Sequence, residues 1–344
     1  MLKTTIDRSN NFDFLRFLLA FSVVVYHLIA LVGNKSLNNP VFTGLGKTPV
    51  YGFFIISGFL ITSSVASGKG LKIYIENRVR RLVPAYVLVV MLSAIFLVFL
   101  STYTYIEYYT DARFWKYLVS NLLFLNFLQP ELPGVFKTNI LQAVDGSLWT
   151  IKVEIAFYIL LPILFAGLKK LKSLREVNWI LIILYALTFF YRYLCDLAFE
   201  VTKIEYLQEF SHQMPGYFNY FGVGMLLYFN FDVVRKYQNK LLILATILIL
   251  LNFVFKWEFL YAPGLGLVIF YIAFNLKFLN NFGKFGDFSY GIYIFHFPIF
   301  QILISIGFIS QEVSVNYLLS IMLVLLASIS SWHLVEKQFL KKKH

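Results

Sequence analysis

Charged residues are scarce in this chain of 344 amino acids. They make up 14% of it, whereas hydrophobic residues make up 59%; a soluble domain has roughly 25% and 45–50% of these two classes. Apolar segments of membrane-spanning length recur from residue 12 to residue 335. This composition excludes a soluble enzyme, a disordered chain and a nucleic-acid-binding domain, even though the net charge is +12. It predicts an all-α polytopic membrane protein that is embedded in the lipid bilayer.

Cysteine is almost absent, since Cys195 is the only one. The sequence therefore allows no intrachain disulfide and no cysteine cluster for a metal. It also lacks a G-x4-G-K-[S/T] phosphate loop, an H-E-x-x-H zinc motif and the His-x4-Asp pattern of soluble glycerolipid acyltransferases. We expect no metal site, and the sequence gives no support to ATP-driven transport or zinc proteolysis.

Ten apolar segments are predicted to be transmembrane helices. They cover residues 12–33, 50–66, 82–102, 147–168, 179–195, 214–230, 241–256, 260–276, 287–308 and 314–335. A further apolar segment, 114–128, is short for a span and is predicted to be re-entrant or interfacial.

The distribution of basic residues predicts the orientation of these spans. With the N-terminus inside, the predicted cytoplasmic segments carry 20 Lys and Arg residues and the external segments carry 6. Because basic residues concentrate in cytoplasmic loops, we expect ten spans with both termini in the cytoplasm. No loop is large enough for a separate soluble domain, so residues 1–344 are expected to form a single integral-membrane domain.

The first predicted span contains ionisable side chains, which are costly in a bilayer and usually functional. Arg16 and His27 are 11 residues apart, so they lie within about 20° of one helix face and ~16 Å apart along its axis. This arrangement indicates a cavity lined by a cation towards the cytoplasm and by a titratable base towards the outside. The alternative is that Arg16 snorkels and His27 is hydrogen-bonded within the bundle.

A carboxylate is expected near His27. Glu154 lies in the fourth predicted span at a similar depth, where it would hold the imidazole in one tautomer and stabilise its protonated form. The alternative is a Lys152–Glu154 pair that fixes helix packing, although residues two apart do not face each other on a helix. In the second span, Ser57 and Gly58 permit the close approach of another helix or of a ligand.

Arginines gather at the cytoplasmic mouth of the third span. The planar guanidinium groups of Arg78 and Arg81 suit the oxygen atoms of phosphate. A basic cluster at this place is equally typical of a cytoplasmic loop without a ligand.

The ninth span begins with polar residues and continues with aromatic ones. Asp287 and Ser289 are candidate caps of this helix. Tyr290, Tyr293 and His296 recur every three residues, which predicts that they lie on roughly one face. A packing role for His296 is as consistent with this pattern as a catalytic role.

Taken in order along nearly the whole chain, five motifs resemble those of the bacterial acyltransferase-3 family of integral-membrane carbohydrate O-acyltransferases. They are Arg16-x10-His27, Phe53–Thr62 (FFIISGFLIT), Arg78-x2-Arg81-x2-Pro84-x-Tyr86, Ser147–Tyr158 (SLWTIKVEIAFY), and the closing pair Ser289–Pro298 and Val335-Glu336-Lys337. Each motif alone is weak, but five in order are specific. One departure is Thr150, which stands where Ser is common and keeps the hydroxyl group. Some relatives carry a fused extracytoplasmic hydrolase-like domain, and none is expected here.

The resemblance implies a ten-span enzyme of the bacterial inner (cytoplasmic) membrane. It would transfer an acetyl or other acyl group from cytosolic acetyl-CoA to a hydroxyl of a cell-surface or lipid-linked glycan, as in lipopolysaccharide, capsule or exopolysaccharide. Arg78 and Arg81 are then expected to bind the donor phosphates at the cytoplasmic mouth. Arg16 would contact the donor deeper in the cavity, and His27 would be the general base that Glu154 orients.

The remaining motif residues are expected to bind substrate or to stabilise the oxyanion. They are Ser57, Gly58, Ser147, Trp149, Tyr290, Tyr293 and His296. Direct transfer and a covalent acyl-enzyme intermediate are both compatible with the sequence. The alternative functions are a flippase or polymerase for a lipid-linked glycan and a proton-coupled transporter.

Overall fold

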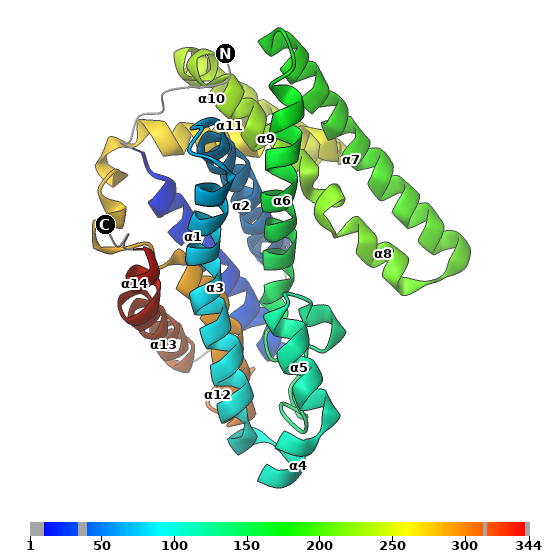
Figure 1. The fold of residues 1–344 in the computed structure, drawn as a ribbon, viewed down its shortest axis with the longest axis vertical. Helices are drawn as coiled ribbons and strands as arrows, with labels where there is room; N and C mark the ends of the chain where they lie inside the picture. Colours follow the sequence, from blue (N-terminus) through cyan, green and yellow to red (C-terminus); the bar gives the residue numbers. More distant parts are fainter. Residues whose placement is uncertain (1–9, 34–39, 312–314, 341–344) are drawn as a thin grey trace. The chain divides into compact units, whose positions relative to one another are not determined.

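The computed structural model describes residues 10–33, 40–311 and 315–340, and within these ranges the chain is all-α (Figure 1). The long helices are α1 (Phe12–Val32), α2 (Pro40–Ala66), α3 (Leu71–Phe96), α6 (Trp149–Leu168), α7 (Leu174–Thr202), α9 (Met214–Phe229), α10 (Phe231–Phe255), α11 (Glu258–Asn275), α12 (Ser289–Ser305) and α13 (Val315–Ser331). The short helices are α4 (Tyr105–Thr110), α5 (Ala112–Leu122), α8 (Glu205–Ser211) and α14 (Lys337–Leu340). A π-helical turn, Trp332–Glu336, joins α13 to α14. The all-α part of the predicted fold class is confirmed.

Eight helical stretches in the described ranges are long and apolar enough to cross a bilayer. They are Phe12–Val32, Gly44–Ala66, Leu71–Leu100, Gly146–Leu168, Leu174–Thr202, Phe231–Phe255, Glu258–Asn275 and Val315–Leu340. The segments Lys277–Phe285 and Ser289–Ser305 meet at a bend of 64° and make a ninth if they form one span. The 16 residues of α9 rise only ~24 Å, which is less than the roughly 30 Å of a hydrocarbon core. By length and composition, the structure thus supports eight or nine of the ten predicted spans.

Several helices extend beyond the apolar runs that predicted them. α3 begins at Leu71, well before the predicted start at residue 82. The added turns are polar and helical. Glu76 and Arg80 form an i,i+4 ion pair on that segment. A hydropathy search detects the apolar part of such a helix and misses its amphipathic start.

The chain divides into two compact units, and each is described here by itself. The first contains the described residues up to Leu15 together with Val50–Tyr74 and Val153–Lys284. The second contains Arg16–Pro49, Ile75–Lys152 and the described residues from Phe285 onward.

In the first unit, glycines bring α2 and α9 into backbone contact. A Cβ atom on Gly58 would lie 2.1 Å from the carbonyl oxygen of Phe221, and one on Gly224 would lie 2.1 Å from that of Ile55. No side chain larger than hydrogen fits such a contact. The close approach predicted at Gly58 is therefore that of a helix.

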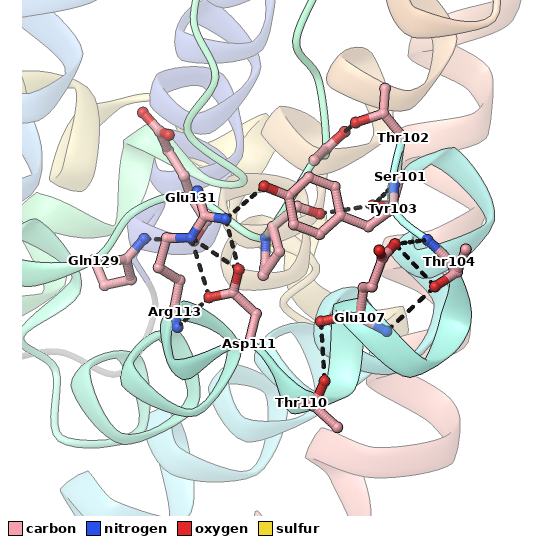
Figure 2. Close-up of polar contacts among 12 residues, drawn as sticks. Ser101, Thr102, Tyr103, Thr104, Glu107, Thr110, Asp111, Arg113, Gln129 and Glu131 are labelled. Atoms are coloured by element: carbon pink, nitrogen blue, oxygen red, sulfur yellow. Dashed lines mark hydrogen bonds and ion pairs between the residues drawn. The ribbon is translucent and has the colours of Figure 1, made fainter.

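In the second unit, a short folded region connects α3 to α6. Thr104 and Glu107 form a capping box at the start of α4. Arg113 of α5 donates to the Tyr103 hydroxyl over 2.8 Å and to Asp111 over 2.6 Å (Figure 2). The segment predicted to be re-entrant or interfacial, 114–128, overlaps most of α5, whose 11 residues rise only ~16 Å. It is not among the candidate spans of the described residues.

Candidate active site

Two arginines of the second unit share one carboxylate. Arg16 of α1 and Arg81 of α3 approach Oδ2 of Asp287 with guanidinium nitrogens at 3.0 and 2.5 Å. The side chain of Asp287 is 11% exposed, and those of Arg16 and Arg81 are 25% and 23% exposed. The other oxygen, Oδ1, accepts the backbone N–H of Ser289 at 3.2 Å and also its hydroxyl. Asp287 thus bonds Ser289, the first residue of α12, although Phe288 is the residue at the cap position and makes no side-chain cap. Asp287 also holds both arginines, which was not predicted.

A second carboxyl group lies beside this arginine cluster. Glu336 is 2% exposed and accepts a hydrogen bond from Ser331 over 3.0 Å. Arg81 and Asp287 are its electrostatic neighbours. Glu336 closes the π-helical turn, an irregularity that is frequent at functional sites. The cluster therefore combines two arginines with two carboxyl groups. An anionic ligand that binds there would meet guanidinium groups whose positive charge the carboxyl groups already neutralise in part.

His27 is hydrogen-bonded to a second histidine. Its Nδ1 atom lies 2.8 Å from Nε2 of His296. His296 is fully buried, whereas His27 is only partly buried. Nδ1 of His296 faces the carbonyl oxygen of Ile292 at 3.2 Å, and the ring of Phe297 packs edge-on against His27. Of the two alternatives for His27, hydrogen bonding within the bundle is the one observed, and a role as base is compatible with it.

Arg16 and His27 of α1 bond to the same partner segment. Arg16 contacts Asp287 immediately before α12, and His27 contacts His296 within α12. The shared face predicted for Arg16 and His27 is confirmed by these two contacts. Sequence spacing gave no indication of the partners, because they are more than 260 residues away along the chain.

Glu154 has its recorded contacts in the first unit. Its Oε1 atom accepts the hydroxyl of Ser57 at 3.2 Å and the hydroxyl of Tyr158. An oxyanion role for Ser57 would require its hydroxyl to exchange this partner for substrate. The orientation of His27 by Glu154 remains a prediction, and His27 Nδ1 is engaged by His296.

Aromatic residues of α12 connect several elements of the second unit. Tyr290 donates to the carbonyl oxygen of Leu82 over 2.9 Å. Tyr293 donates to the carbonyl oxygen of Ser147 over 3.1 Å and lies 2.6 Å from the hydroxyl of Thr150. With His296 bonded to α1, three residues predicted to share one face contact three different elements. Since each step of three residues turns the side chain by about 60°, the three side chains span about 120° of the helix, which lets residues on roughly one face reach three elements.

The start of α6 is held by a buried acid that sequence reasoning missed. Asp145 accepts the backbone N–H of Ser147 at 2.9 Å and its hydroxyl at 2.6 Å. Burial raises the pKa of the Asp145 carboxyl to about 7, although both hydrogen bonds oppose this rise. The hydroxyl of Ser147, two residues before α6 begins at Trp149, is thus bonded to Asp145. The Asp-Gly-Ser sequence before a helix is a capping signal that would have indicated Asp145.

Comparison with known proteins identifies the family of this chain. Residues 9–333 match the family model of the acyltransferase-3 group, described as an acyltransferase domain. The chain belongs to this family. It is a membrane O-acetyltransferase, and the resemblance inferred from its five motifs is confirmed.

Relatives of this acyltransferase come from a phage and from bacteria. An O-acetyl transferase of Shigella phage Sf6 is 27% identical, over 97% of this chain and 97% of its own length. The putative peptidoglycan O-acetyltransferase YrhL of Bacillus subtilis (strain 168) is 24% identical, over 94% of this chain and 54% of its own length. Nodulation protein 10 of Rhizobium leguminosarum bv. viciae is 27% identical, over 88% of this chain and 86% of its own length. No solved structure matches the acyltransferase.

Proposed function

We propose that the enzyme transfers the acetyl group of cytosolic acetyl-CoA to a hydroxyl of a cell-surface or lipid-linked glycan. The observation that carries the proposal is the double contact of α1 with the α12 segment, through Arg16–Asp287 and His27–His296. These contacts are separated by ~16 Å along α1. Arginine suits phosphate and imidazole suits proton transfer. In an acyl-CoA an extended pantetheine arm separates the phosphates from the thioester. One donor molecule would therefore reach both the Arg16–Asp287 contact and the His27–His296 contact.

Arg81 and Arg78 would bind the donor phosphates together with Arg16. Arg81 already converges with Arg16 on one carboxylate, and Arg78 precedes it by one helical turn on α3. Because α3 begins in a basic segment that the charge distribution assigns to the cytoplasm, these arginines would face the cytosolic donor.

The proposal includes a topology of ten spans in the bacterial cytoplasmic membrane, with both termini in the cytoplasm. The tenth span is α9, in addition to the eight straight candidates and the bent pair. Nearly all of its residues are buried, so it would cross within the protein rather than against lipid. The excess of Lys and Arg on the predicted inner segments supports this orientation.

The chemical step is a direct transfer. The acceptor oxygen attacks the thioester carbonyl carbon while Nε2 of His27 takes the hydroxyl proton. When the tetrahedral intermediate collapses, the new ester C–O bond remains, the C–S bond breaks, and the proton passes from His27 to the CoA thiolate.

The names of two relatives support a hydroxyl acceptor, and one of them names a peptidoglycan. One is called an O-acetyl transferase and comes from a phage of Shigella. Another is called a putative peptidoglycan O-acetyltransferase. Both names describe acetylation of oxygen, which fits a hydroxyl acceptor.

The test compares membranes that contain the wild type, His27→Ala or His212→Ala, each supplied with acetyl-CoA labelled on the acetyl group. His212 is the control, since it is an exposed histidine beside α8. Alkali-labile label in the carbohydrate fraction is measured. We expect label with the wild type and the control, and a loss of about 10²–10⁴-fold with His27→Ala. Equal label from His27→Ala would refute its role as base. No label from the inserted wild type would refute acetyl-CoA as donor.

A further inference from the structure

The contact between His27 and His296 fixes where the protons of both rings lie. A carbonyl oxygen only accepts hydrogen bonds, so the contact of His296 Nδ1 with the Ile292 carbonyl at 3.2 Å requires a proton on that nitrogen. In a neutral imidazole the other nitrogen then carries a lone pair. Nε2 of His296 is therefore an acceptor.

The second ring follows from the first. Nδ1 of His27 lies 2.8 Å from His296 Nε2, and a hydrogen bond at this distance needs one proton between the two nitrogens. Since His296 Nε2 accepts, Nδ1 of His27 donates. The remaining nitrogen, Nε2 of His27, then carries its lone pair and is the nitrogen that can take a proton.

We propose that His296 is the positioning residue for His27, holding it in the Nδ1–H tautomer with Nε2 available as the base. This assignment rests on the proposed transferase chemistry of His27. It differs from the role expected from the sequence, in which His296 contacts substrate or the oxyanion. It also gives a neutral imidazole the place that a carboxylate holds in a Ser-His-Asp triad.

The surroundings of the two rings suit this division of roles. His296 is fully buried, and the rings of Tyr293 and Phe300 lie 6.0 Å from it, each steeply inclined to its plane. Such packing holds its orientation and keeps it away from substrate. His27 is less buried than His296, and its Nε2 atom is the nitrogen that the histidine pair does not use. When Nε2 of His27 gains a proton, the Nδ1–H donor becomes part of a cation and its bond to His296 strengthens.

A spectroscopic test reads the tautomers directly. The full-length protein is labelled with ¹⁵N-histidine, reconstituted in bilayers and measured by solid-state NMR at a pH where both rings are neutral. Loss of signals in His27→Asn and in His296→Gln assigns the two rings. Both are expected to show protonated Nδ1 and unprotonated Nε2, the opposite of the form that free imidazole side chains favour. A protonated Nε2 on His27 in the wild type would overturn the proposal, and this result needs no substitution at His296.

A kinetic test separates hydrogen bonding from packing. His296→Gln keeps an acceptor oxygen for His27, whereas His296→Leu fills similar space without one. We expect kcat for acetyl transfer to fall by about 10²-fold or more in His296→Leu and by less than about 10-fold in His296→Gln. KM for acetyl-CoA should stay unchanged in both variants, because the donor phosphates bind elsewhere.

The two proposals fail in different ways. If the wild type transfers no acetyl group, the proposed function fails whatever the tautomers are. If the wild type is active but His296→Leu and His296→Gln have equal kcat, the positioning role fails and the transferase function stands.

Discussion

Asp287→Asn is expected to weaken the structure around the arginine cluster. In the wild type, one carboxylate oxygen faces the guanidinium groups of both Arg16 and Arg81. Asparagine keeps the size of the side chain and an oxygen for Ser289. It removes the negative charge, and its amide cannot offer an anion to both arginines.

The magnitude follows from the distances. The two guanidinium nitrogens lie 3.0 and 2.5 Å from the same oxygen, so they are no more than about 5.5 Å apart. At an effective dielectric constant of about 20, two like charges at that separation repel by ~3 kcal/mol. Loss of one partner of a buried ion pair typically costs 3–5 kcal/mol, and the arginines here are about a quarter exposed. We therefore expect the free energy of unfolding to fall by about 2–3 kcal/mol, or Tm by roughly 5 °C.

The assay is thermal unfolding of the purified protein in detergent. Glu76→Gln is the matched control, because it removes the acid of the Glu76–Arg80 pair, whose side chains are 48% and 35% exposed. Such a pair contributes less than about 1 kcal/mol. Added CoA should raise Tm more in Asp287→Asn than in the wild type, because its phosphates supply the missing negative charge. A Tm for Asp287→Asn equal to that of Glu76→Gln would refute the coupling of the two arginines through Asp287.

Two further predictions concern packing and pH. Gly58→Ala should lower the free energy of unfolding by about 1–3 kcal/mol, because the new Cβ lies 2.1 Å from a backbone oxygen. At Gly167 a new Cβ would meet no atom within 4 Å, so Gly167→Ala should instead raise the free energy of unfolding by about 0.5–1 kcal/mol. Equal changes of Tm in the two variants would contradict this prediction. Burial raises the pKa of Asp145 from 3.8 to about 7, so folding favours its protonated form. The stability from that form is lost progressively as pH rises from about 4 to about 7. Tm of the wild type should therefore drop more between pH 5 and pH 7 than Tm of Asp145→Asn, and parallel curves would exclude Asp145 as the titrating group.

Local properties of the chain were predictable, whereas contacts between distant segments were not. Apolar length is a local property, so the all-α class and most spans could be predicted from composition and hydropathy. α9 shows the limit of predicting spans from hydropathy. Its apolar run predicts a span, but its helix of 16 residues is shorter than a bilayer-crossing helix needs to be. The shared face of Arg16 and His27 was also local, since both lie on one helix. Asp287 bonds to Arg16 across 271 residues, and no spacing rule could connect them.

The role of α12 explains why its sequence was the hardest to interpret. Tyr290, Tyr293 and His296 stand three residues apart on α12, and each step turns the side chain by about 60°, so together they cover about a third of the helix circumference; Asp287 lies immediately before the helix. Asp287 and these three residues bond to the arginines, to α3, to the start of α6 and to α1 in turn. A helix that holds partners on so many sides is apolar or aromatic all round and buried, and it gives no periodic signal of which side is functional. The proposed chemistry needs two residues of this segment, Asp287 immediately before α12 and His296 near the middle of α12. One continuous stretch of chain therefore holds both the arginine cluster and the histidine pair.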